Sequence, residues 1–177
     1  MKRISALLGL FRRRLFSNLL PVWTAAALFL VLPVSVGICD EGTQEALWSF
    51  EGQTGAMVSE TISGTSDPIS GNFRTVIGVS GQALKFDGYT TVVTRRASEA
   101  PQLSGSFTIE AWVALAAYPW SWCPVLSHGT DTSGYALEVG PDGELALKVF
   151  SGSAWRTCIS GTRLPLRAWA HVAGVFD

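Results

Sequence analysis

Residues 107–113 read Phe-Thr-Ile-Glu-Ala-Trp-Val. Apolar residues at 107, 109, 111 and 113 alternate with Thr, Glu and Trp, which predicts a strand with one core face and one mixed face. Three further stretches look like strands: 46–52 (ALWSFEG), 81–88 (GQALKFDG) and 169–176 (WAHVAGVF). Clusters of Gly, Ser, Asp and Pro separate short apolar runs, and no helical period is sustained. The chain beyond its leader is therefore expected to be all-β.

In this order the four stretches resemble the laminin-G-like domains of the concanavalin A-like lectin/glucanase superfamily. The resemblance covers residues 46–177 and implies a jelly-roll β-sandwich. Chain order in that family places further strands after residues 169–176. We therefore expect a domain whose C-terminal strands are missing, and a poor folding unit that aggregates or recruits another chain.

Between these stretches the pattern predicts a short first strand, a long loop and a meander. Trp48 and Phe50 are expected to share one face of the first strand. Residues 51–80 are expected to form a long loop with a short strand near 73–77. Further strands are expected around 83–86, 91–94, 125–126, 135–139, 145–149 and 155–159, with a tight hairpin at Pro141-Asp142-Gly143.

The first 39 residues differ in composition from the rest. Their charges are all basic, and residues 15–39 then carry no charged side chain; the basic residues are Lys2, Arg3, Arg12, Arg13 and Arg14. This pattern predicts a signal peptide or a signal anchor, followed by a short linker at 40–45. Small residues at 35–37 favour cleavage, while the long basic region keeps an anchor open; Ile38 disfavours lipidation at Cys39. Both alternatives export the domain, to a secreted, periplasmic or cell-surface location.

All 14 acidic residues lie after Cys39, together with 8 of the 13 basic ones, so the exported part has a formal charge of −6. That balance argues against nucleic acid as a partner. A membrane partner is expected only if the leader is an uncleaved anchor. Cys123 and Cys158 are candidates for a disulfide in an oxidising compartment, and two unpaired thiols are the equal alternative.

No catalytic set is predicted. Glucanases of the resembled superfamily place several carboxylates at two-residue spacing on one strand. Glu110 has no carboxylate two or four residues away, so a solvent-facing residue or a partner for Lys or Arg is expected. Glu138 and Glu144, flanking the hairpin, are interpreted in the same way. His171 is expected to be a packed, hydrogen-bonded structural residue, and His128 to lie in a loop.

No cofactor is expected, although the resemblance leaves calcium possible. Asp87 and Asp142 precede glycine and are simply turn residues. Asp131 is the remaining calcium candidate.

Tyr118, Trp120 and Trp122, in Tyr-Pro-Trp-Ser-Trp, are the candidate ligand-binding residues. Aromatic rings on a loop stack against sugar faces, and ordinary packing at the end of a sandwich is the alternative. The sequence thus predicts a non-catalytic recognition module that binds glycan or cell-surface material. A secreted glycoside hydrolase and a structural protein–protein module remain the alternatives.

Overall fold

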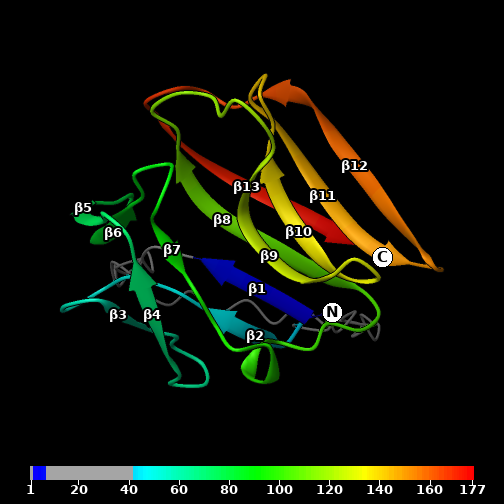
Figure 1. The fold of residues 1–177 in the computed structure, drawn as a ribbon, viewed down its shortest axis with the longest axis horizontal. Coiled ribbons are helices and arrows are strands. Elements are labelled where there is room, and N and C mark those ends of the chain that lie inside the picture. The colour runs from blue at the N-terminus through cyan, green and yellow to red at the C-terminus, as the bar shows by residue number, and fades with distance from the viewer. Residues whose placement is uncertain (1, 7–41) are drawn as a thin grey trace, which may run out of the picture.

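The computed structural model describes residues 2–6 and 42–177. Two four-stranded sheets pack face to face (Figure 1), in the orders β13-β8-β1-β2 and β12-β11-β10-β9. The first contains β1 (Lys2–Ala6), β2 (Gln44–Leu47), β8 (Phe107–Ala114) and β13 (Trp169–Phe176). The second contains β9 (Cys123–Thr130), β10 (Ser133–Val139), β11 (Glu144–Ser151) and β12 (Ala154–Arg163). The predicted all-β sandwich is confirmed.

The main core lies between these sheets. Alternate residues of each strand face inward, and the buried side chains include Ile109 on β8, Leu137 on β10 and Leu147 on β11. The two sheets approach each other closely at Gly174 of β13. A Cβ atom built at Gly174 would lie 3.0 Å from Leu147 Cδ1 and 3.1 Å from Leu137 Cδ1. A glycine at this position therefore lets the two sheets meet.

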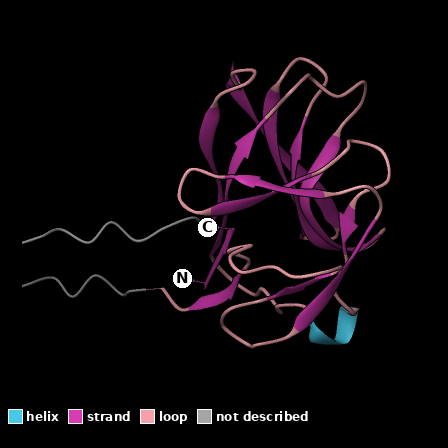
Figure 2. Ribbon diagram, turned by 90° about the vertical axis from the view of Figure 1, so that its left-hand side faces the viewer, coloured by secondary structure: helices cyan, strands magenta, loops and turns pink. Residues whose placement is uncertain are grey.

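Smaller sheets lie beside the sandwich. They are β3 (Met57–Ser59), β4 (Ser66–Ser70) and β7 (Val92–Val93), and the hairpin of β5 (Arg74–Ile77) with β6 (Gln82–Lys85). The short 3-10 helix η1 (Ala97–Glu99) lies on this side, away from the β9–β12 sheet (Figure 2). The predicted long loop at 51–80 is thus wrong, because it contains β3 and β4 besides the expected strand near 73–77.

The first strand also differs from its prediction. β2 ends at Leu47, and Phe50 has a left-handed backbone with φ 58°. Trp48 and Phe50 therefore do not share a strand face. Both pack instead against the second apolar cluster, formed by Val58, Ile69 and Leu84.

A buried ionic cluster joins β2, β4 and the segment after β7. Asp67 is 1% exposed and accepts hydrogen bonds from Trp48 Nε1 (2.7 Å) and from Arg95 Nε (3.0 Å) and Nη2 (2.7 Å). Arg95 Nη1 lies 3.7 Å from Glu60 Oε2, and its guanidinium stands 4.9 Å from the centre of the Trp48 ring. Sequence reasoning missed this cluster, which satisfies its buried charges by pairing.

The predicted leader falls mostly outside the described residues. Its described part, Lys2–Ala6, forms β1 inside the first sheet, and Gln44 and Glu45 of the predicted linker belong to β2. No helix among residues 2–6 and 42–177 is both long and apolar enough to cross a membrane.

Candidate functional site

The outer face of the β9–β12 sheet carries a charged pair near its centre. Leu137 and Leu147 lie opposite each other and face the core, so the next residues along, Glu138 and Lys148, face outward. Lys148 Nζ lies 2.5 Å from Glu138 Oε2, and both side chains are partly buried. The pair provides one cationic donor and one anionic acceptor on the outer side of this sheet.

Trp122 lies over this face near the 140–143 hairpin. Lys148 Nζ stands 5.1 Å from the centre of the Trp122 ring, a cation–π distance. A Cβ built at Gly140 would lie 2.9 Å from Trp122 Cη2, so a glycine there makes room for the ring. The indole is half-buried and held against the sheet.

A pair of aromatic residues lies near the β11–β12 turn. Phe150 and Trp155 are opposite each other in the ladder, and their rings meet edge-to-face at 5.7 Å. Trp155 is 42% exposed, and its Nε1 donates to Asp131 O at 2.9 Å. We call the set Trp122, Glu138, Lys148, Phe150 and Trp155 the outer aromatic face.

The structure separates the three predicted ligand-binding rings. Tyr118 packs, because its hydroxyl donates to Leu164 O at 2.8 Å and the Arg163 guanidinium lies 5.5 Å from its ring. Trp120 is 88% exposed in the β8–β9 loop. Only Trp122 joins the outer aromatic face. Sequence reasoning did not find Phe150 and Trp155, because their pairing depends on the β11–β12 turn, which lies between the predicted ranges 145–149 and 155–159.

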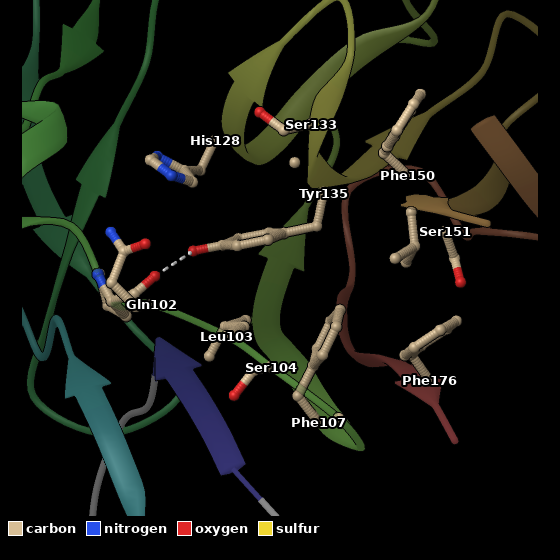
Figure 3. A pocket seen from close by; sticks show the side chains of 14 residues that line it. Gln102, Leu103, Ser104, Phe107, His128, Ser133, Tyr135, Phe150, Ser151 and Phe176 are labelled. Atoms are coloured by element: carbon tan, nitrogen blue, oxygen red, sulfur yellow. Dashed lines mark hydrogen bonds between the residues drawn. The ribbon is translucent and has the colours of Figure 1, made fainter. Parts of the chain in front are cut away.

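A cavity of about 380 Å³ opens at the end of the sandwich where β8 begins and where β11 and β13 end (Figure 3), and Phe150 of the outer aromatic face also lines it. Its walls combine rings with polar groups, among them Phe107, Tyr135, Phe176, His128, Gln102 and Ser133. Tyr135 donates its hydroxyl to Pro101 O at 3.3 Å, and burial raises its pKa to about 12. His128 lies on β9, not in a loop as expected, and its ring stands 5.4 Å from that of Tyr135. Phe107 and Tyr135 are buried core residues, so their rings are less accessible to a ligand than the rings of the outer aromatic face.

Glu110 lies on the outer face of the other sheet. It is buried, which corrects the expectation of a solvent-facing residue, and its Oε2 lies 3.6 Å from His171 Nε2. His171 is exposed, and its ring stands 5.2 Å from that of Trp112. The outward positions next to Glu110 on β8 hold Thr108 and Trp112, so a two-carboxylate arrangement is not built on this strand.

The loop aspartates act in turns or lie at the surface. Asp87 accepts hydrogen bonds from the Thr90 hydroxyl and from the N–H groups of Thr90, Tyr89 and Thr91, which lower its pKa well below the usual range. Asp142 lies 3.7 Å from Arg163 in an exposed pair. Asp131, the calcium candidate, uses its backbone carbonyl to hold Trp155. Among the described residues, no group of three His, Cys, Asp or Glu could hold a metal ion.

Cys123 and Cys158 are both free and exposed. They lie on β9 and β12, the two edge strands of one sheet, with β10 and β11 between them. Three strand spacings amount to roughly 14 Å, whereas a disulfide needs Cα atoms within about 7 Å. The disulfide that the sequence left open is therefore not formed.

Comparison with known proteins agrees with this architecture. The model of the concanavalin A-like lectin/glucanases superfamily matches residues 86–177, slightly more than half of the chain. The match contains the strands at 107–113 and 169–176 and the whole β9–β12 sheet. No curated protein and no solved structure matches the chain significantly. Because the family model matches more than half of the chain and the fold is a β-sandwich, the chain belongs to the concanavalin A-like lectin/glucanases superfamily.

Proposed function

We propose that this domain is a non-catalytic recognition module that binds a glycan along the outer aromatic face. The superfamily supports a carbohydrate- or ligand-binding module in general. The observation that carries the finer proposal is the arrangement on the outer face of one sheet. Trp122 and Trp155 lie toward its two ends, and the Lys148–Glu138 pair lies between them.

This arrangement suits the chemistry of a sugar. The rings offer apolar faces on which the C–H faces of a pyranose stack. The ammonium of Lys148 donates hydrogen bonds to hydroxyls, and the carboxylate of Glu138 accepts them. Lys148 and Phe150 are two residues apart on β11, about 7 Å, so the polar pair and the second ring fall within reach of one short oligosaccharide.

In this proposal the domain does not hydrolyse, through Glu138 or Glu110, the glycan that it binds. Although the superfamily also includes glycosidases, their chemistry requires an acid and a second carboxylate flanking the scissile bond. Glu138 is held by Lys148, and Glu110 lies on the other sheet. Release of reducing sugar from any bound glycan, abolished by Glu138→Gln or Glu110→Gln, would favour the hydrolase alternative.

The test is a glycan array probed with the purified full chain and three variants. Trp122→Ala and Trp155→Ala should each weaken the signal for the same glycans by several-fold, equivalent to about 1 kcal/mol per stacked ring. Trp169→Ala is the matched control, since Trp169 is 37% exposed but lies on β13 of the other sheet. Equal loss in all three variants, or no bound glycan, would contradict the proposal.

We also propose that the domain is exported, because its leader carries basic residues first and then an apolar stretch at 15–39 without a charged side chain. A fusion of residues 1–45 to a reporter that is active only outside the cytoplasm should give activity. A well-expressed but inactive reporter would refute export, and the size of the product would separate a cleaved leader from a retained anchor.

A further inference from the structure

The cavity at the end of the sandwich shares Phe150 with the outer aromatic face, while its other lining residues lie outside that face. Segments far apart in the sequence build it: the 101–105 loop, the starts of β8 and β10, and the ends of β9, β11 and β13. Its volume of about 380 Å³ lies near the lower end of the range of about 300–1,000 Å³ that small-molecule sites span. The cavity therefore suits one small ligand.

The inner wall of the cavity is aromatic and apolar (Figure 3). Phe107, Tyr135 and Val149 line it and are at most 7% exposed. The ring centre of Phe107 lies 5.6 Å from that of Tyr135 and 5.4 Å from that of Phe176. The parts of these neighbouring rings that border the cavity offer an apolar surface on which the C–H groups of a ligand can rest.

Amide and hydroxyl groups surround this wall on the side of the solvent. They belong to Gln102, Ser104, Ser133 and Ser151, and the imidazole of His128 lies next to Tyr135. Gln102 Nε2 donates to Ala100 O at 3.1 Å, which leaves Oε1 as an acceptor. The Tyr135 hydroxyl donates to Pro101 O at 3.3 Å, so its oxygen can still accept a hydrogen bond. The opening of the cavity therefore presents several hydrogen-bonding groups to a ligand.

The cavity holds no strongly charged side chain. Of the described residues that line it, none is Asp, Glu, Lys or Arg. Burial raises the pKa of Tyr135 to about 12, so its hydroxyl stays neutral at physiological pH. The Lys2 ammonium near the 101–105 loop is already engaged, since it donates to Gln102 O at 3.0 Å and lies 3.4 Å from Glu45 Oε1. A charged ligand would lose hydration here without gaining a permanent counter-charge, which favours a neutral ligand.

We propose that this cavity is a second binding site, which takes one neutral monosaccharide. The C–H face of the sugar ring rests on the wall of Phe107, Tyr135 and Phe176, and its hydroxyls meet the polar groups around the opening. A hydroxylated ring suits the cavity better than an aromatic alcohol, because a phenol has one hydroxyl and would leave most of these polar groups without a partner once water is displaced. The site uses neither the Lys148–Glu138 pair nor the tryptophans of the outer aromatic face, so it does not depend on the function proposed above.

The experiment records the ¹⁵N–¹H spectrum of the purified full chain while small probes are added one at a time. The neutral probes are methyl glucoside, methyl galactoside and methyl mannoside. Glucuronic acid and glucosamine are their charged counterparts, and phenol is the aromatic alcohol. At least one neutral probe should shift the signals of the Gln102 side-chain amide and of the Gly105 and Gly134 N–H groups, with a dissociation constant on the order of 1 mM. The charged probes and phenol should bind at least ten-fold more weakly.

Two variants test whether the probe lies in the cavity. Ser104→Phe should fill the opening from the loop and weaken binding at least ten-fold. Ser98→Phe is the matched control and should bind like the wild type, because Ser98 is exposed in η1 and does not line the cavity. Gln102→Leu keeps the size of the side chain but removes its acceptor, and it should weaken binding several-fold, which keeps the test valid if Ser104→Phe does not fold.

Three results would overturn the proposal. The first is that no neutral probe shifts the cavity signals at concentrations well above millimolar. The second is that glucuronic acid, glucosamine or phenol binds more tightly than every neutral probe. The third is that Ser104→Phe and Gln102→Leu, with wild-type melting temperatures, bind the neutral probe as well as the wild type does. A neutral probe that moves the Trp122 indole signal and not the cavity signals would give the first result while supporting glycan binding at the outer aromatic face, so the two proposals can fail separately.

Discussion

Replacing Arg95 by methionine should cost about 3–5 kcal/mol of unfolding free energy, because it leaves the Asp67 carboxylate buried without its cation. Asp67 would keep only the Trp48 Nε1 hydrogen bond at 2.7 Å, and it would lose three contacts with Arg95 at 2.7–3.2 Å. The guanidinium, 8% exposed, also covers the Trp48 ring. The loss is a large share of a domain stability of about 5–15 kcal/mol.

The assay is urea unfolding followed by tryptophan fluorescence. With slopes of about 1–3 kcal/mol/M, Arg95→Met should lower the midpoint by roughly 1–5 M. Arg96→Met is the matched neighbour, since Arg96 is 85% exposed and pairs only with Glu99 at 4.0 Å, and its cost should stay below about 1 kcal/mol. The double variant Arg95→Met/Asp67→Leu should recover part of the loss. Equal midpoints for Arg95→Met and Arg96→Met would mean that Asp67 does not depend on Arg95 as its counter-charge.

Three further predictions concern the sandwich and its acid sensitivity. Burial raises the pKa of Glu60, but hydrogen bonds from the Ser63 hydroxyl and from the N–H groups of Ile62, Leu47 and Ser63 outweigh it and bring the pKa below its ordinary value of 4.5. The stability that the ionised Glu60 contributes is complete above pH 4.5 and is lost as the pH falls through the lower pKa of the folded state. The urea midpoint of the wild-type protein should therefore fall in that acid range, and the midpoint of Glu60→Gln should fall less steeply. Gly174→Val should cost about 1–3 kcal/mol by overpacking Leu137 and Leu147, and an unchanged melting temperature would contradict the close approach of the sheets. Cys158→Ser should leave the urea midpoint unchanged in oxidising buffer, whereas a loss of about 2–4 kcal/mol would mean that Cys158 is bonded.

The sequence predicted the strands whose core faces are uninterrupted. In β8, β10 and β11 the residues at every second, inward position are apolar and buried or partly buried, so the period of two is visible in the sequence. In β4 the inward positions are Asp67 and Ile69, because the strand places a carboxylate into the ionic cluster. An aspartate at a core position hides the alternation, and its partner Arg95 lies 28 residues away. No local pattern could therefore have identified β4.

The candidate site was predictable only in part. The loop at 118–122 is aromatic-rich in the sequence, but only the structure shows that Tyr118 packs, Trp122 covers Lys148 and Trp120 stays exposed. Phe150 and Trp155 became part of the site because the β11–β12 register places them opposite each other. That register depends on the turn between the strands, which the predicted ranges 145–149 and 155–159 did not include.

The most direct test of glycan recognition is a two-dimensional ¹⁵N–¹H spectrum of the tryptophan indole N–H groups, recorded while the best array ligand is added. The indole signals of Trp122 and Trp155 should move in a saturable way with one common dissociation constant. The signals of Trp48 and Trp169, in the ionic cluster and on the other sheet, should stay in place. Saturable shifts confined to Trp48 or Trp169, with Trp122 and Trp155 unmoved, would contradict binding at the outer aromatic face.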